Sequence, residues 1–142
     1  MEEYLSNCPV AAFGWHPGAG RWSILEITAH LADAELLASA RIRRIITQDR
    51  PEMRGYQQEV WAQGLAYVRQ RIETVSARFI ILRRENAGLL EMIGAEIWRL
   101  KGRHDEYGEL SLRHYDRRLH HAHRKASESN ELRGGGVRSF KK

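Results

Sequence analysis

Cysteine is nearly absent from this sequence, since Cys8 is the only one in 142 residues. A single thiol excludes an intramolecular disulfide and a multi-cysteine zinc site, and it is consistent with a reducing compartment. Long apolar runs are also missing, because no window of about 18 uncharged apolar residues exists. The N-terminal residues lack the basic segment and apolar run of a signal peptide. The sequence therefore predicts no membrane span and a cytoplasmic protein.

The motifs of several common enzyme classes are absent as well. The chain has no glycine-rich phosphate loop, no Gly-x-Ser-x-Gly elbow and no His-Glu-x-x-His pair. These motifs are the local signatures of nucleotide-binding proteins, hydrolases and metalloproteases, respectively. The sequence therefore argues against the commonest forms of these three classes.

Positive charge is concentrated near one end of the chain, although the formal net charge is +5 overall. Residues 112–142 contain nine Arg and Lys against three Asp and Glu, whereas the first 111 residues contain fourteen against fifteen. A near-neutral body argues against nucleic acid as a partner. Association through the basic end is a weaker alternative, which a steep salt dependence of binding would have to support.

Length and composition are those of one globular domain. A chain of 142 residues with 42% hydrophobic and 29% charged residues can fill a single core. Apolar periodicity stops near residue 127, ahead of a Ser-Glu-Ser-Asn-Glu stretch, three consecutive glycines and a basic end. We expect a single domain over residues 1–127 and a flexible basic tail over 128–142.

The clearest helical segment begins at Ser23. Ser23 and Glu26 form a capping box, in which each side chain can bond the backbone N–H of the other residue. The apolar residues that follow recur at three- and four-residue spacing, which is typical of an amphipathic helix. This helix is expected to end near Gln48, because Pro51 cannot continue the hydrogen-bond ladder.

Three further helices are expected. The first is a shorter one over 57–67 with Trp61 and Leu65 facing inward. The second is a long helix over 72–93, and the third begins after Ser111. Residues 94–110 are expected to form an ordered connection without strands. These elements predict an all-α protein built as a helical bundle.

One polar residue, Asn86, falls inside the apolar stripe of the second long helix. A buried amide costs free energy unless it is hydrogen-bonded. We expect Asn86 to be satisfied in the core, with a cavity-facing role as the alternative.

Histidine is abundant, with seven in the chain. At 100° per residue, His30 lies about 85° from the centre of the apolar stripe, at the edge of the buried face. There it can look along the groove between helices, where bundle proteins build metal sites, or it can be a half-buried histidine bonded to a neighbour. His104, on an expected loop, is a weaker candidate.

Four more histidines crowd the last helix. The same angular count turns Asp116, His120 and His123 inward, and His114 and His121 nearly opposite. Asp116 with His120, or His120 with His123, has the spacing to chelate one cation from one helical face. A solvated, histidine-rich surface is the alternative.

Residues 20–35, Gly-Arg-Trp-Ser-Ile-Leu-Glu-Ile-Thr-Ala-His-Leu-Ala-Asp-Ala-Glu, resemble the first-histidine signature of the DinB/YfiT-like superfamily. Three later segments follow in the order that family shows: 56–67 with Trp61, Phe79-x-x-Leu82-Arg83-x-x-Asn86, and 102–112. The resemblance covers about residues 20 to 125.

This resemblance implies an up-down four-helix bundle, commonly a homodimer, that holds a divalent metal such as Zn²⁺ or Ni²⁺. The family's ligands are one histidine of the Trp-Ser-x-x-Glu helix and two histidines four apart on the last helix. His30 matches the first ligand. The implied activity is that of a metal-dependent transferase or hydrolase acting on a small-molecule or thiol substrate.

The chain departs from the family pattern in two places. Only about twenty residues precede the Trp-Ser segment, so the first helix is expected to be truncated. Residues 115–123 read Tyr-Asp-Arg-Arg-Leu-His-His-Ala-His, without a His-x-x-x-His pair. The predicted metal ligands are therefore His30, His120 and His123, the last two from geometry alone. The alternative is a degenerate, metal-free bundle that acts through dimerisation or a partner surface.

Overall fold

The computed structural model describes residues 9–117, 119 and 121. Its elements in chain order are α2 (Val10–Phe13), α3 (Ile24–Thr47), β1 (Glu52–Met53), α4 (Gln58–Gly64), the 3₁₀ turn η1 (Tyr67–Arg69), α5 (Ile72–Ile93), the 3₁₀ helix η2 (Ala95–Arg99), β2 (Lys101–His104) and β3 (Gly108–Ser111). A last helical segment begins at residue 112 and is described to 117, with 119 and 121 also helical. Helices make up most of the described chain, as the all-α prediction requires.

Several predictions concern residues outside this range. Cys8, His120, His123 and the expected tail over 128–142 lie outside the described residues. Ahead of α3, the described residues contain only the four-residue α2. Because residues 1–8 are not among those described, the length of the first helix stays a prediction.

Helix α3 begins where the capping box predicted. The Ser23 backbone N–H donates to Glu26 Oε2 at 2.8 Å, and the Glu26 N–H donates to Ser23 Oγ at 3.3 Å. These two bonds satisfy donors that a helix N-terminus would otherwise leave without partners. The helix ends at Thr47, one residue before the expected end.

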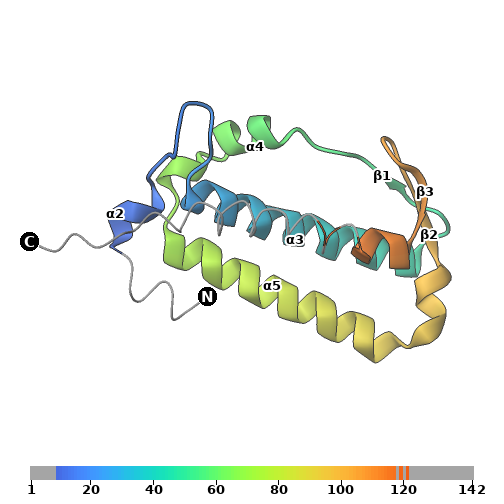
Figure 1. Cartoon of the computed structure of the whole chain (residues 1–142). Coiled ribbons are helices and arrows are strands. Elements are labelled where there is room, and N and C mark those ends of the chain that lie inside the picture. The colour runs from blue at the N-terminus through green and yellow to red at the C-terminus, as the bar shows by residue number, and fades with distance from the viewer. Residues whose placement is uncertain (1–8, 118, 120, 122–142) are drawn as a thin grey trace, which may run out of the picture.

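Helices α3 and α5 lie side by side and run in the same direction (Figure 1). Contacts between them follow a parallel course, because Asp33 pairs with Arg78 and Glu35 pairs further along with Arg83 and Asn86. The connection over 48–71 carries the chain back along the bundle before α5 starts (Figure 1). A simple up-down order would have made these two helices antiparallel.

The helix expected over 57–67 is shorter than predicted. Helix α4 ends at Gly64, and Ala66 adopts a left-handed conformation with φ of 48° before η1. Trp61 is partly buried against the core, as expected, but Leu65 is 49% exposed. The inward prediction for Leu65 is wrong because the helix stops before its side chain can turn toward α3.

The prediction that residues 94–110 contain no strand is also wrong. Strand β2 pairs in parallel with β1 and antiparallel with β3. Gly102 of β2 packs so closely that an added Cβ would lie 2.8 Å from Met53 Cε and 3.2 Å from the Pro51 carbonyl. The absence of a side chain at Gly102 therefore lets β2 sit on β1 and the end of α3.

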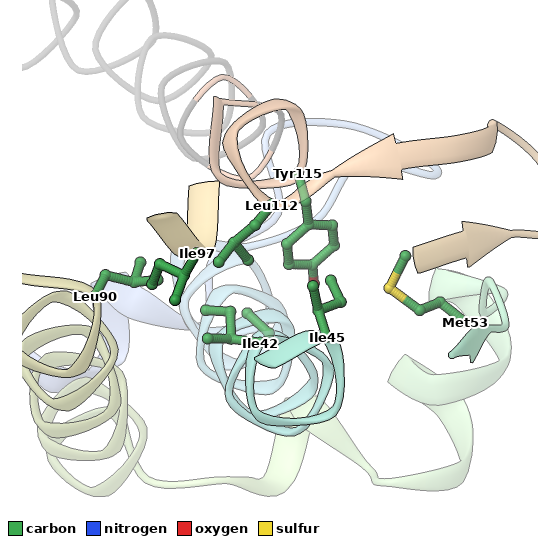
Figure 2. Packing of buried hydrophobic residues seen from close by; sticks show 8 residues of the cluster. Ile42, Ile45, Met53, Leu90, Ile97, Leu112 and Tyr115 are labelled. Carbon is green, nitrogen blue, oxygen red and sulfur yellow. The ribbon is translucent and has the colours of Figure 1, made fainter. Parts of the chain in front are cut away.

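Two apolar clusters stabilise the bundle. The cluster near the sheet joins α3, α5, η2 and the last helical segment through Ala38, Ile42, Ile45, Met53, Leu90, Ile97, Leu112 and Tyr115. Figure 2 shows Leu112 and Tyr115 reaching down onto Ile42 and Ile45 of α3. The other cluster joins α2, α3, η1 and α5 through Phe13, Leu25, Ala29, Tyr67, Ile72 and Val75. Burying each large apolar side chain contributes about 1.5–3 kcal/mol.

A polar layer lies between these clusters along the α3–α5 seam. Asp33 accepts from the Tyr67 hydroxyl at 2.7 Å and pairs with Arg78 at 3.1 Å. Glu35, fully buried, accepts from Asn86 Nδ2 at 2.8 Å and has Arg83 at 2.8 Å. The prediction that the Asn86 amide is hydrogen-bonded in the core is confirmed for Nδ2, whereas its buried Oδ1 has no hydrogen-bond partner among the described residues.

Within the residues that the structure describes, no helix is long and apolar enough to cross a membrane.

Candidate functional site

An open cavity of about 840 Å³ lies along the side of α3 that does not face α5. One wall is α3 itself, which contributes His30, Ala34, Leu37 and Arg41 at spacings of four, three and four residues. Residues at this spacing share one helical face. The other walls are the segment over 55–58, the β2–β3 hairpin and the last helical segment.

His30 is half-buried at the edge of this cavity. Its ring lies edge-on to Trp22 at 5.4 Å between centroids, and its Nδ1 lies 3.4 Å from the Tyr56 hydroxyl. Burial lowers the pKa of His30, and this outweighs the opposite influence of Asp33 and Glu59. The imidazole is therefore neutral near pH 7, the form that binds a metal or accepts a proton.

Two tyrosine hydroxyls face the same space from different elements. Tyr56 comes from the loop before α4 and Tyr115 from the last helical segment. Burial raises the pKa of Tyr56 to about 12. Burial also raises the pKa of Tyr115, although its hydrogen bond with Arg41 acts in the opposite direction. Both hydroxyls therefore keep their protons at neutral pH and can donate hydrogen bonds.

Arg41 supplies a half-buried guanidinium at the cavity wall. It donates to the carbonyl of Arg54, and its Cζ lies 5.9 Å from the centroid of the Tyr115 ring. These contacts fix the guanidinium between the loop and the last helical segment.

The hairpin places a second buried histidine at the cavity. His104 is 5% exposed, its Nδ1 accepts from the Glu106 N–H at 3.2 Å, and its ring packs on Tyr107 at 4.8 Å. From the sequence, His104 was a weak candidate metal ligand on an expected loop. The structure instead places it at the end of β2. The alternation of Gly102 and His104, both buried, was a signal too short to identify a strand.

The prediction that His114 and His121 of the last helix point away from the interior is partly wrong. His114 and His121 are exposed, as their angles predicted, yet both line the cavity because it opens at the surface. The Ser111 hydroxyl accepts from the His114 N–H at 3.3 Å and so caps the start of this helix. Tyr115 and Leu119, four residues apart, also line the cavity.

The residues that line the cavity indicate how well the chain could hold a metal. Tyr115 and Leu119 are the i,i+4 pair that faces the space lined by His30, and neither is a usual ligand of Zn²⁺ or Ni²⁺. No group of three His, Cys, Asp or Glu among residues 9–117, 119 and 121 is arranged to hold an ion. Of the three predicted ligands, His30 lines the cavity, and His120 and His123 lie outside the described residues.

Comparison with known proteins connects this geometry with a family. The fold resembles that of YfiT from Bacillus subtilis, with a TM-score of 0.76 and 17% identity over 94% of this chain and 79% of that one. YfiT is described as "a probable metal-dependent hydrolase with an unusual four-helix bundle topology". None of the curated proteins compared with the chain matches it. The DinB superfamily model matches residues 1–123, and the chain therefore belongs to the DinB superfamily as a four-helix bundle.

Proposed function

We propose that this protein binds a divalent metal, Zn²⁺ or Ni²⁺, at the cavity through His30 and acts there as a hydrolase or thiol transferase on a small molecule. The observation that carries the proposal is His30, a neutral, half-buried imidazole on the wall of the cavity of about 840 Å³. When bound, such an ion polarises a substrate oxygen or makes a bound water or thiol more acidic.

The contact between His30 and Tyr56 supports this role. Metal-binding histidines usually bond a neighbour through the ring nitrogen that does not bind the metal, which fixes the ring orientation. Tyr56 faces Nδ1 of His30 at 3.4 Å, so Nε2 is the nitrogen left for an ion. The completing ligands that we propose are His120 and His123 of the last helix, whose described part already lines the cavity.

Other residues of the wall suit a small-molecule substrate. The cavity volume of about 840 Å³ lies within the range of ligand pockets. Tyr56 and Tyr115 offer hydroxyl donors, and Leu37 and Leu110 offer apolar surface. These residues would orient a substrate beside His30.

Metal content of the purified, untagged protein tests the proposal. We expect about one ion per chain in the wild type and loss of the ion in His30→Ala, His120→Ala and His123→Ala. His16→Ala is the matched control, because His16 pairs with Glu26 at 2.7 Å and does not line the cavity. A chelator should lower the unfolding temperature of the wild type and leave that of His30→Ala unchanged, since bound ligand stabilises only the folded state.

A second candidate is a metal-free bundle, and the Tyr115 and Leu119 pair favours it. These side chains line the cavity four residues apart on the last helical segment, and neither is a usual metal ligand, whereas the family resemblance implies two histidines four apart on the last helix. In that case the wild type would contain no ion and its unfolding would not respond to a chelator. The protein would then act through the cavity without a metal, or through the homodimer that the family resemblance implies.

A further inference from the structure

We propose that Arg41, with the hydroxyls of Tyr56 and Tyr115, binds the anionic group of a small molecule, either a carboxylate or a phosphate. The inference rests on the proposed function only in placing the ligand in the same cavity. It names the class of ligand and does not require a metal.

The guanidinium of Arg41 has no carboxylate partner among the described residues. A half-buried guanidinium is costly unless a carboxylate or several acceptors compensate it. Within the described part of the chain, no carboxylate lies within ion-pair distance of Arg41, which bonds the Arg54 carbonyl and Tyr115 instead. A guanidinium has five N–H donors, so these two contacts leave donors for a bidentate anion.

The described cavity wall contains more basic than acidic side chains. Its described lining contains two arginines, Arg41 and Arg117, and one acid, Glu106. The carboxylate of Glu106 lies against Gly55, where an added Cβ would be 2.6 Å from Oε1. The wall therefore has an excess of positive charge, which favours an anionic ligand.

The three residues of the proposed anion site come from distant parts of the chain. Arg41 comes from α3, Tyr56 from the loop before α4, and Tyr115 from the last helical segment. All three residues line the cavity, and Arg41 Cζ lies 5.9 Å from the centroid of the Tyr115 ring. Tyrosine rings at the same cavity can pack against a flat or aromatic body that carries the anion.

Calorimetric titration with benzoate, phenyl phosphate and uncharged benzamide tests the inference, on protein treated with a chelator. We expect benzoate or phenyl phosphate to bind at one site per chain and benzamide to bind at least tenfold more weakly. Arg41→Gln should weaken binding of the anion at least tenfold. Arg43→Gln, two residues along α3 and exposed, is the matched control and should bind as the wild type does.

Arg41→Lys, with Arg43→Lys as its control, keeps the test decisive if Arg41→Gln does not fold. The lysine retains the charge but loses the bidentate fork, so affinity should fall severalfold. Stronger binding of benzoate than of phenyl phosphate would identify a carboxylate site, and the reverse a phosphate site. Equal binding by the Arg41 and Arg43 variants, or by benzoate and benzamide, would overturn the inference.

The two proposals fail in different ways. Anion binding that persists in wild type without any metal and is weakened by Arg41→Gln supports the Arg41 site, whereas the absence of an ion from the purified wild type contradicts the metal proposal alone. Anion binding that requires added Zn²⁺ and ignores Arg41→Gln supports the metal and overturns the Arg41 site.

Discussion

Charged residues on the two sides of α3 differ in whether they have an oppositely charged partner. On the side that packs against α5 and η1, Asp33 and Glu35 are buried, and each has a cationic partner at 3.1 and 2.8 Å. On the cavity side, His30 and Arg41 have no carboxylate within ion-pair distance among the described residues. One side therefore uses charge to join helices, and the other presents charge to a cavity.

This difference separates structural from functional polar residues on a single helix. A buried charge that is paired and hydrogen-bonded within the fold has its desolvation cost offset. Removing one member of such a pair leaves the other charge buried without compensation. A charge on a cavity wall remains accessible to a ligand. Substitutions on the α5 side should therefore change stability, and substitutions on the cavity side should change binding.

The largest expected effect is that of Glu35→Ala. Its removal leaves Arg83 and Asn86 without their carboxylate at the centre of the seam, and we expect a loss of about 3 kcal/mol in the free energy of unfolding. Denaturant titration measures it. Glu85→Ala, at an exposed position of α5, serves as the control, and equal losses in both variants would contradict the structural role of Glu35.

A pair of tyrosine substitutions compares the two sides directly. Tyr67→Phe removes a fully buried hydroxyl that donates to Asp33, and we expect a loss of about 1.5 kcal/mol. Tyr56→Phe removes a hydroxyl that faces His30 and the cavity, and we expect a change below about 0.5 kcal/mol. Thermal or denaturant unfolding of both variants measures the contrast, which disappears if the two losses are equal.

A further, moderate effect concerns the start of α3 and depends on pH. Burial of Glu26 acts to raise its pKa, but the hydrogen bonds from Ser23 and the nearby His16 outweigh burial and lower it. The folded pKa is thus below the ordinary 4.5, so the ionised carboxylate stabilises the fold above that pH and loses this effect as the pH falls through the folded pKa. We expect Glu26→Gln to be about 1 kcal/mol less stable than wild type at pH 7.

Unfolding of both proteins over a pH series checks this expectation. The difference between wild type and Glu26→Gln should shrink as the pH falls below 4.5. A difference that stays constant, or grows, as the pH falls would show that the charge of Glu26 does not contribute.

The bounds of the long helices were predictable because their signals are local. The capping box of Ser23 and Glu26 gave the start of α3, and the apolar spacing over 72–93 matched α5. A hydrogen bond of the Asn86 amide in the core was also predicted, although its partner Glu35 was not, because 51 residues separate the two.

The sheet and most of the cavity were not predictable. Strands β2 and β3 have four residues each and are held by pairing with one another and with β1, about fifty residues earlier. Tyr56 lies on a loop without a periodic pattern, so nothing local marked it as a neighbour of His30. His104 was undervalued for the same reason.

By itself, the sequence determined where the two long helices begin and end, and it placed His30 at the edge of a buried face. Capping bonds and three- to four-residue spacing act within one or two turns, so they are written in adjacent residues. Only the tertiary structure decided that α3 and α5 run in parallel, that Glu35 pairs with Arg83, and that Arg41 meets Tyr115 in a cavity. These arrangements depend on long-range packing, in which one side chain meets another from a distant part of the chain.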